Sequence, residues 1–102
     1  MARLPRPLTL SEKEMLVLQL LVGGGEMYGL QLVTESGGRL KRGTVYVTLG
    51  RMEDKGYIRS TLEAGSPSTG GLPRRLYEPT ALGRSVLKAW SEASERLLPR
   101  FA

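Results

Sequence analysis

The stretch from Gly43 to Ile58, GTVYVTLGRMEDKGYI, most constrains what this 102-residue chain can fold into. On a helix, Val45, Leu49 and Met52 fall at positions i, i+4 and i+7, so they form one apolar stripe. Gly56 predicts the end of that helix, because glycine readily adopts the left-handed conformation that terminates helices. The segment therefore predicts a short helix that is buried along one side and exposed along the other.

The exposed side of this predicted helix is polar and basic, with Tyr46 and Val47 beside it: Thr44, Thr48, Arg51 and Lys55. Lys41 and Arg42 come just before the helix, where free backbone N–H groups already favour anions. A short helix with hydroxyls and cations on its exposed side fits the major groove of DNA. An ordinary amphipathic surface helix is the alternative interpretation.

Positive charge is concentrated around the same helix. Fifteen Lys and Arg residues against ten Asp and Glu residues give the chain a net charge of +5. Between Arg39 and Arg59, six basic residues stand against only Glu53 and Asp54. This clustering is expected of a surface that binds a polyanion, although a solvated basic surface without a ligand remains the alternative.

Two residue types that carry much of enzyme chemistry, cysteine and histidine, are absent. Disulfides, cysteine-ligated zinc and His-dependent catalytic triads are thereby excluded. The neighbouring carboxylates Glu12 with Glu14 and Glu53 with Asp54 lie among lysines, which favours salt bridges over acid–base catalysis. The triple glycine at 23–25 lacks the Gly-Lys-Ser/Thr that grips a nucleotide. We expect no enzymatic activity, no metal site and no cofactor.

No apolar run is long enough to cross a membrane, and the N-terminal residues do not resemble a signal peptide. We therefore expect a cytoplasmic protein with no membrane partner. Met1–Pro7 is rich in proline and arginine and predicts an extended, flexible arm.

Two helices are predicted before the basic one. Ser11 and Glu14 form a capping box at the start of the first helix, which is apolar nearly all round and ends at the triple glycine. Such a helix has to be covered on several sides, so a second subunit is one way to cover it. The second helix spans Glu26–Ser36 and is ended by Gly37 and Gly38. With the helix at 43–55 it predicts a helix-turn-helix.

Two short β-rich segments follow the basic helix, Tyr57–Glu63 and Arg74–Glu78. The loop between them, Ala64–Pro73, consists largely of turn-forming residues. This arrangement predicts a wing with Arg74 and Arg75 at its base. These cations are expected to contact DNA phosphates, and the alternative is strand-edge charge that prevents aggregation.

Thr80 predicts the N-cap of a last helix that runs to about Leu98. Its apolar side chains recur at three- and four-residue spacing: Leu82, Val86, Trp90, Ala93 and Leu97. This stripe is longer than the core of so small a monomer needs, which favours a dimer.

The basic helix resembles the recognition helix of the PadR family of winged-helix transcriptional regulators, whose pattern is Gly-Thr-Leu-Tyr-Pro-x-Leu-x-x-Leu-x-x-x-Gly-hydrophobic-Ile/Val. The positions that match are Gly43, Thr44, Tyr46, Leu49, Gly56 and Ile58. Val47 stands where many members carry proline. Downstream, RLYEPTALGR is similar to the family's Arg-x-Tyr-x-Leu-Thr-x-x-Gly-Arg, with Pro79 in place of leucine. Tyr28-Gly29 resembles the family's entry to the second helix, where glycine permits close helix approach.

The resemblance spans roughly Leu8 to Trp90 and implies that the first and last helices build a dimer. Some members of this family hold flat hydrophobic effectors between their subunits. By this resemblance, Trp90 is a candidate for stacking on a small hydrophobic effector. The alternative is that Trp90 simply packs against the first helix of the same or the partner subunit.

These observations predict an α+β, mostly helical fold: a winged helix-turn-helix DNA-binding domain at 1–80 and a C-terminal dimerisation helix at 81–102. We expect a homodimeric transcriptional repressor that binds double-stranded DNA at a pseudo-palindromic operator. The predicted DNA-binding residues are Lys41, Arg42, Thr44, Tyr46, Val47, Thr48, Arg51, Lys55, Arg74 and Arg75. The predicted dimer interface consists of Leu16, Leu20, Leu82, Val86, Trp90, Ala93 and Leu97. The alternatives are a basic domain that binds structured RNA and a module for protein assembly.

Overall fold

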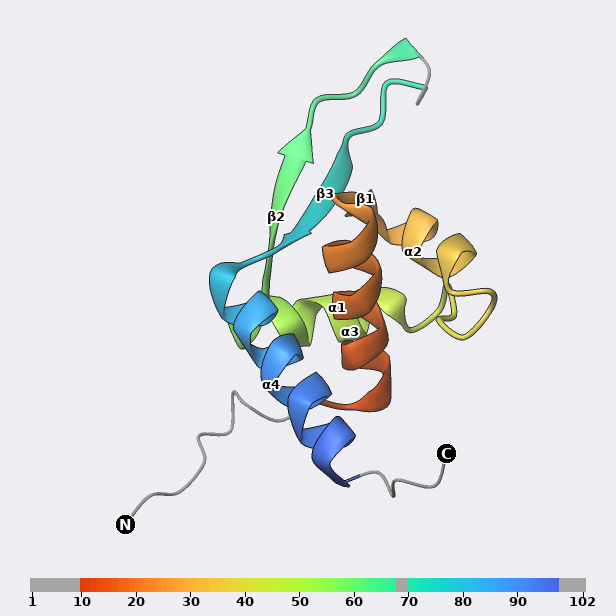
Figure 1. Ribbon diagram of the computed structural model, residues 1–102. Helices are drawn as coiled ribbons and strands as arrows, with labels where there is room; N and C mark the ends of the chain where they lie inside the picture. Colours follow the sequence, from red (N-terminus) through yellow and green to blue (C-terminus); the bar gives the residue numbers. More distant parts are fainter. Residues whose placement is uncertain (1–9, 68–69, 98–102) are drawn as a thin grey trace.

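The computed structural model of the chain describes residues 10–67 and 70–97, and the predicted arm at 1–7 lies outside them. The elements follow in the order α1 (Glu12–Gly24), β1 (Met27–Tyr28), α2 (Gly29–Glu35), α3 (Val45–Asp54), β2 (Ile58–Glu63), β3 (Arg74–Pro79) and α4 (Ala81–Leu97). The helices form one body, from which the β2–β3 hairpin projects as a wing (Figure 1). The predicted α+β winged-helix fold is confirmed.

Helix α1 begins where the capping box predicts. The backbone N–H of Glu14 donates to Ser11 Oγ over 3.1 Å, and that of Ser11 donates to Glu14 Oε1 over 2.9 Å. These two bonds satisfy two N–H groups that have no partner inside the helix. The start of α1 is therefore encoded locally, in four consecutive residues.

The segment at 26–36 differs from its prediction as a single helix. Met27 and Tyr28 form β1, and α2 begins only at Gly29. In the sheet, whose order is β1-β3-β2, Met27 lies opposite Tyr77 and Tyr28 lies opposite Leu76. A two-residue strand has no periodicity of its own, so only its pairing with β3, about 50 residues later, defines it.

The wing strands β2 and β3 are antiparallel, and their register runs from Ile58 opposite Pro79 to Glu63 opposite Arg74. Successive side chains of a strand point to opposite faces of the sheet. Ile58, Tyr77 and Pro79 are buried on the face toward the helices. The other face carries charged pairs, Arg59 opposite Glu78 near the helical body and Glu63 opposite Arg74 next to the loop.

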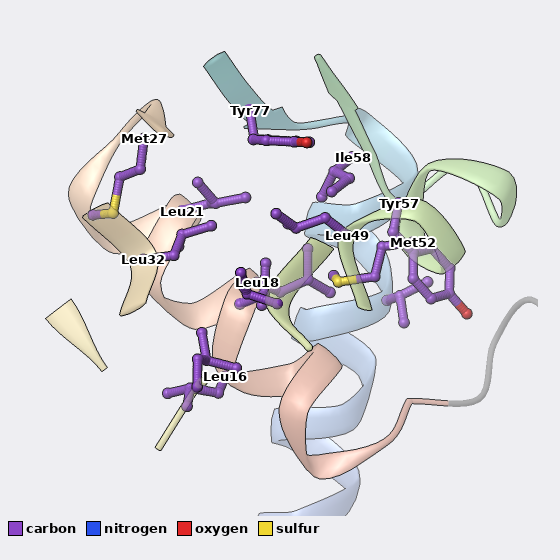
Figure 2. Close-up of a cluster of buried hydrophobic side chains, with 14 residues drawn as sticks. Leu16, Leu18, Leu21, Met27, Leu32, Leu49, Met52, Tyr57, Ile58 and Tyr77 are labelled. Carbon is purple, nitrogen blue, oxygen red and sulfur yellow. The ribbon is translucent and has the colours of Figure 1, made fainter. Parts of the chain in front are cut away.

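The hydrophobic core joins the helices to the base of the wing. Figure 2 shows side chains from α1, α2, α3 and the strands converging on one region, among them Leu18, Leu32 and Leu49. The predicted stripe of α3 is confirmed, because Val45, Leu49 and Met52 are all buried. Burying a leucine or methionine side chain stabilises a fold by about 1.5–3 kcal/mol, so this stripe fixes which side of α3 faces outward.

Helix α4 begins at the predicted N-cap. Thr80 Oγ1 accepts a hydrogen bond from the Gly83 N–H over 3.0 Å and donates one to the Gly56 carbonyl over 2.5 Å. The Thr80 N–H donates to the Tyr57 carbonyl over 3.0 Å. Thr80 thus ties the start of α4 to the end of α3.

Two of the residues predicted for a dimer interface belong to the core of a single chain. Leu16 is 8% exposed and Val86 only 2%, because α1 and α4 pack against each other within the subunit. The prediction that a partner covers these two side chains is therefore corrected. Leu20 and Trp90 are only partly buried, Leu82 and Ala93 are exposed, and the side chain of Leu97 lies outside the description.

Within residues 10–67 and 70–97, no helix combines the length and the apolar character that a membrane crossing requires.

Candidate nucleic-acid interface

The N-terminal half of α3 is presented to solvent. Tyr46 and Val47 are 50% and 55% exposed, and Thr44 and Arg51 are exposed as well. Thr44 is the N-cap, but its side chain makes no capping hydrogen bond. The N–H groups of Val45 and Val47 already donate to the carbonyls of Lys41 and Thr44. The start of the helix therefore offers an anion the exposed Thr44 hydroxyl rather than a row of free N–H groups.

Thr48 does not belong to this exposed surface, so the prediction of its exposure is wrong. It is 9% exposed, and its hydroxyl donates to the Thr44 carbonyl over 3.4 Å. Position 48 turns toward the start of α1 and lines a shallow groove there together with Ser11 and Glu14. A helical projection could not locate α1, and α1 is what covers Thr48.

The turn between α2 and α3 places two cations beside the helix start. Gly37 and Gly38 have φ of 64° and 90°, left-handed values that favour glycine. Ser36 Oγ accepts from the N–H of Leu40 over 2.9 Å and donates to the Val33 carbonyl over 2.7 Å, so it fixes the turn. Lys41 and Arg42 follow immediately and are both exposed.

Among the side chains that the structure describes, those of residues 10–67 and 70–93, the ion pairs are Lys55 with Glu14 and Arg59 with Glu78. The cations next to the exposed part of α3, namely Lys41, Arg42 and Arg51, are in neither pair. Their charges are therefore not neutralised by a carboxylate of the described chain. This is the charge distribution that a phosphate-binding surface requires.

Lys55 was predicted to join that surface, but the structure gives it an internal role. Its Nζ lies 2.8 Å from Glu14 Oε2, and the Glu14 side chain is only 6% exposed. The same ammonium lies 5.7 Å from the centre of the Tyr57 ring. Burial raises the pKa of the Tyr57 phenol, and the Glu14 carboxylate adds to this effect. Lys55 compensates a buried carboxylate, and we remove it from the candidate DNA-binding residues.

Close approach of α2 and α3 positions Tyr46. A Cβ at Gly29 would lie 2.5 Å from the Tyr46 ring, so the ring packs directly over the glycine. Gly29 is buried while Tyr46 remains half exposed. The close helix approach expected at Tyr28-Gly29 is confirmed, and its consequence is a fixed aromatic ring on the exposed face.

Gly50 lies on the same outward side of α3, between Tyr46 and Asp54 in the helical projection. It has no positive φ, and a Cβ built on it meets nothing within 4 Å. Glycine inside a helix costs about 0.5–1 kcal/mol relative to alanine. No contact within the described chain explains this glycine.

The other two predicted cations, Arg74 and Arg75, lie at the start of β3, next to the loop of the wing rather than at its base, and both are exposed. Arg75 Nη1 donates to Ser60 Oγ over 3.0 Å, and Ser60 Oγ donates to Glu53 Oε2 over 2.8 Å. The guanidinium of Arg74 lies 3.9 Å from the centre of the Tyr28 ring. The hydroxyl of Tyr28 donates to Glu63 Oε1 over 2.5 Å.

Helix α3 and the wing share one groove of about 670 Å³. Its lining joins the start of α2, the exposed part of α3 and the loop end of the wing strands: Tyr28, Gly29, Leu30, Gln31, Tyr46, Leu62, Pro73, Arg74 and Arg75. The two wing arginines and Tyr46, which were predicted separately, thus line one continuous surface. Tyr28 was not predicted as part of it, because only the β1–β3 pairing brings Tyr28 to the wing.

Comparison with known proteins places this geometry in a family. The transcriptional regulator PadR-like family matches residues 17–89, which is most of the chain. No curated protein matches the sequence at a significant level.

Solved structures share the fold. A PadR family transcription regulator from Clostridium difficile R20291 is 29% identical, with a TM-score of 0.69 over 81% of this chain and 86% of that chain. A PadR family regulator from Eggerthella lenta DSM 2243 is 30% identical, with a TM-score of 0.68 over 81% of this chain and 71% of that chain. Bacillus subtilis PadR, solved in complex with operator DNA, is 22% identical, with a TM-score of 0.69 over 81% of this chain and 48% of that chain. At that identity the likeness is one of fold alone.

Proposed function

The chain belongs to the transcriptional regulator PadR-like family, and we propose that it is a sequence-specific double-stranded DNA-binding regulator that acts as a homodimeric repressor in the cytoplasm. One observation carries this proposal. The exposed part of α3 lies between cations that no carboxylate of the described chain neutralises and a wing strand, β3, that begins with two further arginines. The complex of Bacillus subtilis PadR with operator DNA supports it through the shared fold.

In this proposal the exposed half of α3 enters the major groove. Arg51 is the residue that we assign to a guanine contact. An arginine that donates to both O6 and N7 of guanine contributes about 1–3 kcal/mol of discrimination against other bases. Thr44, Tyr46 and Val47 meet bases or phosphates near the helix start. Phosphate contacts are assigned to Lys41, Arg42, Arg74 and Arg75.

The dimer is proposed to form through the segment 81–102, which includes α4, together with α1. Partly exposed apolar side chains support this: Leu20, Leu82, Trp90 and Ala93. A twofold protein reads a twofold site, so the operator is an imperfect palindrome whose half-site centres lie about 10 bp apart or a multiple of that distance. Sedimentation of the protein with and without operator tests this stoichiometry, and one subunit per saturated site would contradict it.

The experiment that tests the function is a titration of labelled nucleic acid followed by fluorescence anisotropy. Operator duplexes come from selection on random DNA, and a scrambled duplex and a structured RNA of equal length serve as controls. With about six to ten phosphates neutralised per dimer, log affinity should fall against log salt with a slope of roughly −5 to −9. A slope near zero, or equal affinity for RNA, contradicts the proposal. Repression is tested by a reporter promoter that contains the selected operator.

A small planar hydrophobic effector that binds near Trp90, between the subunits, is proposed as a second partner. Trp90 packs partly buried against the core from α4, and an indole offers a flat apolar surface for stacking. A planar hydrophobic probe should then quench Trp90 fluorescence saturably and lower operator affinity over the same concentration range. Quenching without any change in operator affinity would leave Trp90 with a packing role only.

A further inference from the structure

Three charged or polar side chains meet at the loop end of the paired wing strands, beside β1. Glu63 of β2 lies directly opposite Arg74 of β3, so their side chains project from the same face of the sheet. Tyr28 of β1 pairs opposite Leu76, two residues along from Arg74 on that face. A carboxylate opposite a guanidinium would normally form an ion pair, since this is the strong, charge-assisted kind of hydrogen bond.

The same face contains a comparison for this arrangement. Arg59 and Glu78 are also directly opposite each other on β2 and β3, and they do form the ion pair, with Arg59 Nε donating to Glu78 Oε1 over 2.6 Å. Glu63 and Arg74 form no ion pair by the same geometric criterion. The two cross-strand pairs differ in that the aromatic ring of Tyr28 contacts the second one.

Tyr28 engages both members of the unformed pair. Its hydroxyl donates to Glu63 Oε1 over 2.5 Å, and its ring lies 3.9 Å from the guanidinium carbon of Arg74. The hydrogen bond to Glu63 raises the pKa of the Tyr28 phenol, so the hydroxyl stays a donor throughout the neutral range. Stacking uses the flat face of a guanidinium and leaves the N–H groups at its edge free to bind an oxyanion.

We propose that Tyr28 is a positioning residue that keeps Arg74 apart from Glu63 and so holds the Arg74 charge ready for a DNA phosphate beside the wing. This inference rests on the proposed function. It deepens that function by naming the residue that decides whether this wing cation is available. The location agrees with it, because Tyr28 and Arg74 line the groove that also contains Tyr46 of α3.

The proposal predicts how operator affinity and its salt dependence change when Tyr28 is replaced. In Tyr28→Leu, Arg74 and Glu63 close into an ion pair as Arg59 and Glu78 do, and each subunit loses one phosphate contact. Operator affinity should fall roughly three- to tenfold, and the salt slope of a dimer should become shallower by about 2. Tyr28→Phe keeps the ring but releases Glu63, so its effect should be intermediate.

Rescue separates positioning from simple structural damage. Glu63→Gln added to Tyr28→Leu removes the competing carboxylate and should restore both the affinity and the slope to within twofold of wild type. The matched control is Glu78→Gln added to Tyr28→Leu, which removes one negative charge from the same face and should not restore the slope. Thermal unfolding of each variant confirms that the compared proteins are folded.

Two results overturn the inference while the proposed function stands. One is a wild-type protein with the steep salt slope beside a folded Tyr28→Leu variant of unchanged affinity and slope. The other is equal rescue by Glu63→Gln and Glu78→Gln, which would mean that only net charge matters. A wild-type protein whose salt slope is near zero overturns the proposed function itself, and this inference with it.

Discussion

The two ends of α3 differ in how they contact the rest of the chain. At the C-terminal end, Lys55 is paired with a buried carboxylate, Tyr57 is fully buried and the Gly56 carbonyl accepts the Thr80 hydroxyl. At the N-terminal end, the Thr44 side chain makes no capping bond, and Tyr46 and Val47 are about half exposed. The C-terminal end of α3 is bonded to α1, to β2 and to the start of α4. The N-terminal end instead exposes polar and apolar side chains to solvent.

This difference explains how so short a helix could contact DNA bases in the proposed function. Ten residues are too few to hold a helix by their own propensity, so tertiary contacts must supply the stability. Because those contacts are concentrated at the C-terminal end and along the buried stripe, the exposed side chains of the N-terminal end are free to contact a partner. Substitutions at the two ends should therefore separate, with stability lost at one end and operator affinity at the other.

Gly83→Ala should have the largest effect on the C-terminal end of α3. A Cβ at position 83 would clash with the Tyr57 carbonyl oxygen, which is backbone and cannot turn aside. Overpacking of this kind typically costs about 1–3 kcal/mol, and we expect the upper part of that range. Urea unfolding measures the loss. A Gly83→Ala protein of wild-type stability would mean that α4 does not rest on the end of α3 as described.

Lys55→Ala should cost about 2 kcal/mol, because it leaves Glu14 buried without its counter-charge. We place the value below that for a fully buried pair, since the Lys55 side chain is 29% exposed. The matched control is Arg59→Ala, whose pair is 71% and 30% exposed and should contribute less than about 0.5 kcal/mol. If both variants lost the same free energy of unfolding in urea, the Lys55–Glu14 pair would stabilise the fold no more than the surface pair of Arg59 and Glu78.

Gly29→Ala tests the N-terminal end of α3. The new methyl group would displace the Tyr46 ring, but that ring is half exposed and can swing outward, so stability should change by less than about 1 kcal/mol. Operator affinity should fall about tenfold, equivalent to 1.4 kcal/mol. Tyr46→Ala should cause a similar loss, and combining the two substitutions should add little. Additive losses would show that Gly29 acts on DNA binding by some other route.

Gly50→Ala should have the smallest effect and the opposite sign on stability. With open space around the new Cβ, alanine should stabilise the protein by about 0.5–1 kcal/mol through its helix propensity. Any loss of operator affinity in this variant would come from the surface of α3 alone, because the fold is not weakened. A decrease in the free energy of unfolding would contradict the described surroundings of Gly50.

Features that depend on neighbouring residues could be predicted from the sequence. The capping box of Ser11 and Glu14, the helix stop at Gly56 and the N-cap at Thr80 each involve residues three or fewer positions apart, or a single glycine. The apolar stripe of α3 also follows from spacing alone. For the same reason the wing and the exposure of Tyr46 and Val47 were predictable, and the family resemblance strengthened the assignment of the fold.

Features that depend on distant residues could not be predicted. Strand β1 exists only through β3, and Lys55 meets Glu14 across 41 positions in the chain. The burial of Thr48 depends on where α1 crosses α3, and the burial of Val86 depends on how α4 packs within one subunit. The role of Tyr28 combines both difficulties, because it requires the strand that was missed and the cross-strand register of the wing.

The hydrogen bonds of Thr80 have a mechanical consequence. The side chain and the N–H of Thr80 donate to the carbonyls of Gly56 and Tyr57. These bonds hold the end of α3 and the start of α4 together as one rigid unit within a subunit. In the proposed dimer, any change in the angle at which the two α4 helices cross is then carried to the separation of the two α3 helices. One base pair inserted between the half-sites rotates them by about a tenth of a turn. In the proposed dimer, the stiffness of this junction would therefore set how strictly the protein measures operator spacing.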